Sequence, residues 1–261
     1  MFGTTGDGTT RDGSGTPRTV PRTGEKRKTM KKEKKISTPG FGAYVFQLLS
    51  DTYTVNKCDI GEDALLSRKG IELMTDAYDV QGLGHLCIMR MAGLRGLIGM
   101  ETVVLSLTEK DVPLFNLDWL AIFGKEVQTA ELYDIQIAFQ PDWLQKKYQM
   151  IKDRDAEIAD YTSDKEHWYD DIRYSCTYEK TGRKVSGKLH RAGKDCARIF
   201  LAQTAKAPDC DPAVKMERIR DFAEKLYAEG GPAVDMIKGL FGEETAKRVI
   251  LRHMYGVESE V

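Results

Sequence analysis

Residue types that build metal and disulfide sites are scarce in this sequence of 261 residues. It contains four histidines, none at H-x-x-x-H spacing, and five cysteines without a C-x-x-C pair. This pattern fits neither a His-rich metal centre nor a zinc ribbon, and an odd number of cysteines does not suit a disulfide framework. We therefore expect no bound metal and a reducing compartment.

Long apolar runs are also missing. No stretch approaches the roughly 18 uninterrupted apolar residues of a membrane span, and residues 1–5 do not begin the apolar run of a secretory signal. With 41% hydrophobic and 9% aromatic residues, the sequence still has enough apolar material for a sizeable core. We expect a folded protein with no membrane partner.

The net charge of -1 hides a division between the two parts of the chain. Residues 1–37 carry ten Lys/Arg and four acids, about +6, whereas the remainder carries 29 basic and 36 acidic residues, about -7. The first segment is rich in Gly and Thr and has almost no apolar residues. Because such a segment cannot bury enough surface to offset its ordering entropy, we predict a disordered basic tail.

The cluster of cations between Lys26 and Lys35 is compatible with contact to nucleic acid or anionic lipid. Composition alone carries little specificity, however. A solvated leader, or translated sequence ahead of a start at Met30, is the simpler interpretation. A transit peptide fits less well because that class is poor in acids. We expect no nucleic-acid partner.

From Ile71 to Ala138, short apolar stretches alternate with glycine-rich or charged breaks. This pattern predicts a meander of antiparallel strands, over Ile71–Met74, Leu86–Met91, Thr102–Leu107, Leu117–Phe123 and Val127–Tyr133. Pro113 excludes a helix at its own position and disfavours one just before it. Gly124-Lys125 predicts a hairpin turn.

Helical spacing occurs on both sides of this region, first at Tyr44–Leu49 and again after Pro141. The later helices are predicted over Lys194–Ala205, Ala213–Ala228 and Glu243–Tyr255. Residues 58–70 remain unassigned, and residues 160–185 are expected to have little regular structure. The order indicates an α+β fold, with helices packed on a central antiparallel sheet in a single domain over residues 38–261.

Familiar site motifs are incomplete. The spacing Gly93-x-x-Gly96-x-x-Gly99 lacks the Lys-Ser/Thr ending of a P-loop and the βαβ frame of a dinucleotide site. His85 and Cys87 would share one face of a strand, but no third metal ligand accompanies them, so we interpret them as a hydrogen-bonded His beside a buried thiol. No G-x-S-x-G is present.

Two motifs follow one another in the body of the chain. The first is Val112–Trp119 (VPLFNLDW), followed by the Gly-Lys turn and a stretch ending at Asp134. The second is Gly239–Arg248 (GLFGEETAKR), which continues to Met254–Val257 (MYGV). Together, in order and approximate spacing, they resemble the ferredoxin-dependent bilin reductases, the family of phycocyanobilin:ferredoxin oxidoreductase and phytochromobilin synthase. Red chlorophyll catabolite reductase is similar in fold and chemistry.

The resemblance implies an α/β/α sandwich, a central antiparallel sheet flanked by helices. It implies a pocket for an open-chain tetrapyrrole (bilin) such as biliverdin, between the sheet and the C-terminal helices. It also implies an oxidoreductase with no bound cofactor, which receives single electrons from ferredoxin and supplies protons to a bilin radical. Such a protein would lie in the cytoplasm, or in the plastid stroma of a eukaryote.

Asp118 falls on the family's central-strand aspartate, which hydrogen-bonds the pyrrole nitrogens or lactam and relays a proton. A carboxyl group that faces an apolar pocket has a raised pKa and can donate near neutrality. A hydrogen-bonded acid at the start of a strand is an equally simple interpretation. Asn116, in the same motif, is a candidate substrate-binding residue.

The chain departs from the family at other acids. The family's catalytic His has no counterpart in Val103–Leu107, and no His occurs from 86 to 166. No Asp or Glu occurs from 80 to 100, where its partner Glu would fall. Asp235 is a candidate for the second aspartate, although it stands a few residues late. Arg90, Arg95 and Lys238 are candidate propionate anchors, although an ordinary surface residue is the simpler interpretation of each.

Two functions remain open. One is a bilin reductase with Asp118 as the proton donor, and the other is a non-catalytic linear-tetrapyrrole-binding or carrier protein on the same fold. Ferredoxins are acidic, so a reductase is expected to show a basic docking face. The acidic body argues against such a face unless charge segregates locally.

Overall fold

An antiparallel sheet of eight strands forms the centre of the fold. The computed structural model describes residues 38–139, 142–163 and 165–258, so the predicted basic tail, residues 1–37, lies outside the described residues. The strands are β1 Val55–Lys57, β2 Leu65–Arg68, β3 Ile71–Val80, β4 Gly84–Gly93, β5 Ile98–Leu107, β6 Leu114–Ile122, β7 Lys125–Tyr133 and β8 Tyr178–Gly182.

The sheet is a meander in which consecutive strands lie side by side. The order is β1-β3-β4-β5-β6-β7-β8, and every pairing is antiparallel. The short strands β1 and β2 share the outer edge of β3, where β1 pairs with its end and β2 with its start. They therefore cover most of an edge that would otherwise be open to pairing with another chain.

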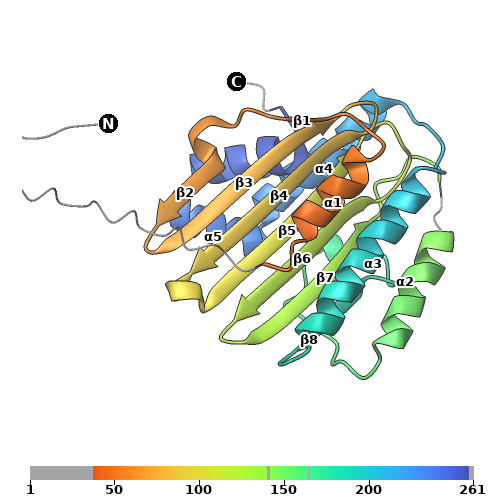
Figure 1. The fold of residues 1–261 in the computed structure, drawn as a ribbon. Coiled ribbons are helices and arrows are strands. Elements are labelled where there is room, and N and C mark those ends of the chain that lie inside the picture. Colours follow the sequence, from red (N-terminus) through yellow and green to blue (C-terminus); the bar gives the residue numbers. More distant parts are fainter. Residues whose placement is uncertain (1–37, 140–141, 164, 259–261) are drawn as a thin grey trace, which may run out of the picture. The chain divides into compact units, whose positions relative to one another are not determined.

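Helices cover both faces of the sheet (Figure 1). They are α1 Phe41–Ser50, α2 Asp142–Arg154, α3 Ser186–Thr204, α4 Pro212–Glu229, α5 Pro232–Phe241, α6 Glu243–Lys247 and the π-helix η4 Arg248–Met254, with the short 3-10 helices η1 Gly61–Ala64, η2 Leu94–Gly96 and η3 Trp168–Ile172. Helices α1, α2 and α3 pack on one face and form one hydrophobic core, whereas α4, α5, α6 and η4 form a second core on the other face. This arrangement confirms the predicted α/β/α sandwich.

Strand β6 shows how the two cores are separated. Phe115, Leu117 and Trp119 belong to the core under α1–α3, whereas Leu114 and Leu120 face the helices of the C-terminal half. Successive side chains of a strand point to opposite faces, so one apolar strand serves both cores. Asn116 and Asp118 lie between Leu114 and Leu120 on the face toward the C-terminal helices. Their polar side chains are therefore placed in the interior of the fold.

The sequence predictions for this region are largely confirmed, with two corrections. The five predicted strands are present, and residues 123–124 form the turn between β6 and β7. The prediction of little regular structure over residues 160–185 is wrong at β8, because its hydrogen-bonding partner β7 is distant in sequence. The second correction concerns the helix predicted over Glu243–Tyr255, which is an α-helix only at its start, α6, and then continues as the π-helix η4. None of the described helices has the length and apolar content needed to cross a membrane.

Glu101 on β5 holds the start of α1. Its carboxylate accepts hydrogen bonds from the backbone N–H groups of Gly40 (2.8 Å), Phe41 (3.0 Å) and Gly42 (3.0 Å). These are donors that a helix N-terminus leaves unpaired, and a negative charge there also interacts favourably with the helix dipole. The side chain is only 1% exposed, so one buried carboxylate links α1 to the sheet.

We expect Glu101→Gln to lower the free energy of unfolding by about 1–3 kcal/mol, because an amide loses the charge and cannot accept all three hydrogen bonds. Urea denaturation at neutral pH measures the change. The matched control is Glu72→Gln on β3, an exposed position where less than about 0.5 kcal/mol is expected. Equal effects of the two substitutions would contradict the assigned role of Glu101.

Candidate functional site

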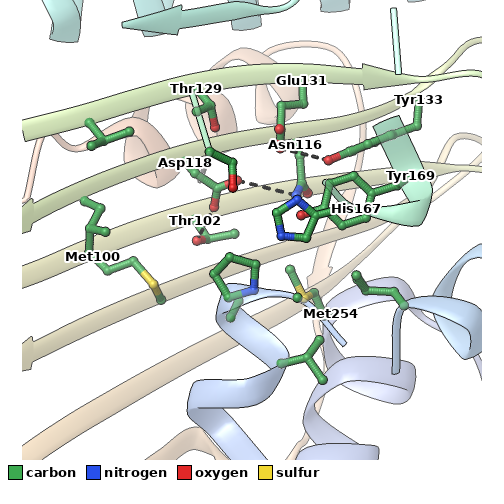
Figure 2. Close-up of a pocket in the computed structure, with 18 of the residues that line it drawn as sticks. Met100, Thr102, Asn116, Asp118, Thr129, Glu131, Tyr133, His167, Tyr169 and Met254 are labelled. Carbon is green, nitrogen blue, oxygen red and sulfur yellow. Dashed lines mark hydrogen bonds between the residues drawn. The ribbon is translucent and has the colours of Figure 1, made fainter. Parts of the chain in front are cut away.

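A cavity lies between the sheet and the helices of the C-terminal half. Strands β5, β6 and β7 form its floor, and α5, η4 and the segment that contains η3 cover it (Figure 2). The space amounts to about 1200 Å³, including the part that opens to solvent. Its lining is mainly apolar and aromatic, with contributions from Met100, Tyr169, Phe222, Leu226 and Met254. A cavity with this lining is typical of a site for a mostly apolar small molecule.

A row of polar side chains crosses the floor. Thr102, Asp118 and Thr129 stand opposite one another on β5, β6 and β7, and all three line the cavity. The Thr102 hydroxyl donates a hydrogen bond to Asp118 Oδ1, and the Asn116 amide donates one to Asp118 Oδ2 at 3.4 Å. Figure 2 shows these side chains directed from neighbouring strands toward the same space.

Burial raises the pKa of the Asp118 carboxyl group to about 7. The nearby charge of Glu131 acts in the same direction, whereas the hydrogen bond from Thr102 opposes it. A carboxyl group with this pKa is partly protonated at neutral pH, so it can both donate a proton and recover it from solvent. This is the chemical capacity that the sequence analysis assigned to Asp118.

Glu131, two residues along β7 from Thr129, belongs to an ion-pair network. It accepts hydrogen bonds from the Tyr133 hydroxyl (2.9 Å) and the Arg173 guanidinium (3.0 Å). Arg173 also contacts Glu179 at 2.7 Å and Asp170 at 2.9 Å. Burial raises the pKa of Glu131 despite the opposing effect of Arg173. Because Arg173 follows η3, the network joins the covering segment to the floor of the cavity.

His167 also lines the cavity. Its ring stacks on Tyr169, with centroids 4.9 Å apart and planes 4° from parallel. The backbone N–H of His167 donates to Asp170 Oδ2 at 2.8 Å, which fixes the start of η3. His167 was not among the predicted site residues because it does not lie on a strand. The one available signal was the aromatic segment that contains it.

The entry to β6 is braced by Lys215 of α4. The buried ammonium donates to the carbonyl oxygens of Val112 (2.6 Å) and Ile135 (3.0 Å). Burial lowers the pKa of Lys215 to about 8, an effect that the Asp111 carboxylate opposes. These contacts hold the start of β6 and the segment just after β7, and thereby the strands that carry Asp118 and Glu131.

The structure gathers Asp118 and Asn116 at the cavity and places Asp235 outside its lining. Asp235 is exposed on α5, whereas its neighbours Val234 and Met236 line the cavity. A helix turns by about 100° per residue, so adjacent positions face different directions. The catalytic role of Asp235 therefore remains a prediction made from the sequence.

The candidate propionate anchors also lie outside the lining. Arg90 is on the opposite face of β4 from Met89 and Met91 and pairs with Asp76. Arg95 is exposed in the turn between β4 and β5. Lys238 donates to the carbonyl oxygen of Tyr227 at 2.8 Å and lies over its ring. Arg173 is the one Lys or Arg among the described residues of the lining.

Metal chemistry has no obvious site in the described part of the chain, where no group of three or more His, Cys, Asp or Glu could hold an ion. His85 Nε2 lies 2.8 Å from the carbonyl oxygen of His253, and Cys87 is buried. The interpretation of this pair as a hydrogen-bonded His beside a buried thiol is confirmed.

From the raised pKa of Asp118 we predict how the stability of the protein depends on pH. Between about pH 4, the value of an unfolded aspartate, and pH 7, the folded protein binds one more proton at this site than the unfolded chain. The contribution of Asp118 to stability therefore falls as the pH rises through this range. The free energy of unfolding of Asp118→Asn relative to that of wild type should therefore be about 1–4 kcal/mol higher at pH 8 than at pH 5. Urea denaturation at both pH values measures it.

The control for this experiment is Asp221→Asn, an exposed position on α4. The pH dependence measured for Asp118→Asn is compared with that of this variant. A constant difference for Asp118→Asn would show that its carboxyl group titrates normally in the folded protein.

No protein-family model matches the sequence, and no curated protein matches it. Among solved structures, phytochromobilin synthase from tomato, determined in complex with biliverdin, matches with a TM-score of 0.65 at 15% sequence identity. The match covers 82% of this chain and 81% of that one. At this identity the likeness shows the fold. The chain therefore shares the α/β/α sandwich fold of that structure.

Proposed function

We propose that the protein binds an open-chain tetrapyrrole in this cavity and reduces it, with electrons from ferredoxin and protons from its own side chains. The observation that carries the proposal is the Asp118 carboxyl group, which faces an apolar cavity from a central strand and has a pKa of about 7. The solved structure of the same fold with biliverdin bound supports the choice of ligand class.

The cavity offers complementary surfaces to such a ligand. Methionine and aromatic side chains, among them Met100, Phe222 and Met254, can pack against the faces of the pyrrole rings. The floor presents Asp118, Asn116 and Thr129, whose side chains can pair with pyrrole N–H groups and lactam oxygens. Arg173 is already engaged by three carboxylates, so the propionate groups of the ligand would lie toward the opening, in contact with water.

Reduction of one double bond adds two electrons and two protons to the ligand. Ferredoxin supplies electrons one at a time, so the first electron gives a radical anion, which Asp118 protonates. The second electron then requires a second proton. His167 lines the same cavity, and histidine is the side chain that most often acts as a general acid. The apolar side chains around the floor limit access of water to the radical.

The alternative is a non-catalytic protein that binds or carries a linear tetrapyrrole. One observation favours it: the β5 stretch Val103–Leu107 contains no His, and the resemblance places the family's catalytic His there. A carrier needs the cavity but not the proton supply. The two functions therefore differ in the fate of the bound ligand, which a reductase converts and a carrier leaves unchanged.

Addition of biliverdin to the purified protein should produce a new absorbance band in the red, because a bound bilin is held in one conformation in an apolar site. The band should then disappear with ferredoxin and a reducing system as the conjugation changes. A band that persists under these conditions would leave only the carrier. No spectral change with any linear tetrapyrrole would contradict both functions.

A matched pair of variants on α5 locates the bound ligand. Ala233→Trp places a large side chain in the lining. It should weaken bilin binding by about tenfold or more, because the indole ring would occupy space that the ligand needs. Gly239→Trp, at an exposed position of the same helix, should bind as the wild type does. Thermal denaturation confirms that both variants are folded.

Asp118→Asn should retain bilin binding but slow reduction by about a hundredfold or more, or divert it to another product, because the amide cannot donate the proton. Binding is measured from the absorbance titration, and the rate and product from turnover with ferredoxin. Asp221→Asn serves as the control for an unrelated loss of charge. Full activity of Asp118→Asn would remove this residue from the mechanism.

A further inference from the structure

Four chain segments meet at one end of the sheet, where β2, β4, β6 and β8 finish (Figure 1). They are the turn between β2 and β3, the turn between β4 and β5, the turn between β6 and β7, and the segment after β8; we call residues 68–71, 93–98, 122–125 and 182–185 the turn edge. Neighbouring turns touch. The N–H of Phe123 donates to the carbonyl oxygen of Leu97 (2.9 Å), and Arg183 donates to the carbonyl oxygen of Phe123 (2.7 Å).

The turn edge contains cations and no acids. Its six Lys and Arg residues are all exposed, and none forms an ion pair within the part of the chain that the structure describes; they are Arg68, Lys69, Arg95, Lys125, Arg183 and Lys184. On a body that is acidic as a whole, this is a segregated positive surface.

Large apolar side chains protrude among these cations. Leu94 is 47% exposed, Leu97 53%, Ile122 41% and Phe123 56%. Single exposed apolar residues need no explanation, but four on adjacent turns form a patch, and such patches mark interaction sites.

The backbone conformation of the turns favours other residue types than the ones found here. Every non-glycine residue with positive φ in the described ranges lies in the turn edge, and each is a cation or a large apolar residue: Lys69, Leu94, Arg95, Phe123 and Lys184. Two-residue hairpin turns with positive φ at both positions favour Asn-Gly, whereas this chain has Lys69-Gly70 and Phe123-Gly124. The strained positions therefore carry side chains that the turns themselves do not require.

The sequence contains no membrane span and led us to expect no membrane partner, but the exposed tips and cations of the turn edge point the other way. We propose that the turn edge docks on an anionic lipid surface, with Leu94, Leu97 and Phe123 inserted among the acyl chains and the flanking cations at the lipid phosphates. Each cation near such a surface strengthens binding, and the apolar tips anchor it.

The shape of the edge favours lipid over an acidic protein. The apolar side chains project from the tips of separate turns and do not line the cavity between the sheet and the C-terminal helices. A protein partner would need a complementary hollow for each tip, because packing at the centre of a protein interface is as dense as in a protein interior. A lipid layer adapts its shape to separate tips. Docking of this kind does not depend on which ligand the cavity binds.

The test uses the full chain with vesicles of phosphatidylcholine, with or without phosphatidylglycerol. The basic residues 1–37 can attract anionic vesicles by themselves, so binding alone does not decide the question. Phe123→Trp places a fluorophore at the proposed insertion point. On anionic vesicles, nitroxide groups on the lipid acyl chains should quench this added emission, and they should not quench the emission added by Met150→Trp, an equally exposed position on α2.

A double variant measures the contribution of the apolar tips. Leu97→Ser with Phe123→Asn should weaken vesicle binding by about tenfold or more, whereas Met150→Asn should not. Asparagine suits the backbone at position 123, so folding is preserved.

The proposal is overturned if the protein does not bind anionic vesicles, or if it binds with no quenching of the Phe123→Trp emission and equal affinity for the double variant. Binding to a soluble acidic ferredoxin that the double variant loses, without vesicle binding, would identify the turn edge as a protein-docking surface instead.

Discussion

The placement of an ionisable group on a buried sheet face is the constraint on which the site depends. Strand β6 must pack Phe115, Leu117 and Trp119 against one helical layer, and alternation then directs Asn116 and Asp118 to the other layer. Desolvation there raises the pKa of Asp118, and Glu131 on the next strand adds to the effect. The cost of burying these carboxyl groups is reduced by hydrogen bonds from Thr102 and Arg173. The resulting cavity floor places a polar, proton-donating group in a mainly apolar surrounding, which is the combination that proton transfer requires.

Rigid elements hold the reactive side chains, and a less regular segment covers them. Lys215 fixes the strand ends beside the site through two backbone carbonyl oxygens, and Glu101 fixes α1 on the opposite face. In its described residues, the cover between α2 and β8 has one short helix, η3. Arg173 links it to Glu131 and Glu179, and the backbone of Tyr174 and Tyr161 links it to β7 and β8. Side chains on strands keep their geometry when a ligand enters.

Local sequence patterns predicted the parts of this structure that depend on nearby residues. The strands of the meander, the Gly124 turn and α4 follow from periodicity and turn chemistry. Strand β8 does not, because its pairing with β7 comes from distant parts of the chain. The same reason explains the site. Asp118 was identified through a motif on one strand, but His167 and Arg173 enter the cavity from the covering segment, and no local pattern indicates which loop residues will reach a distant strand. Arg90 was misleading because strand alternation directs it to the opposite face.

Charges of opposite sign are segregated within the folded part of the chain. The carboxyl groups near Asp118 collect around Arg173, whereas the turn edge holds six cations and no acid. Both groups are supported by the same strands, since β5 and β6 run from the turn edge to the cavity floor. The cations contribute nothing appreciable to the pKa of Asp118, whose causes are burial, Glu131 and Thr102. Separation along the strands, together with solvent screening of exposed charges, allows one sheet to present a positive edge without ionising the acid in its interior.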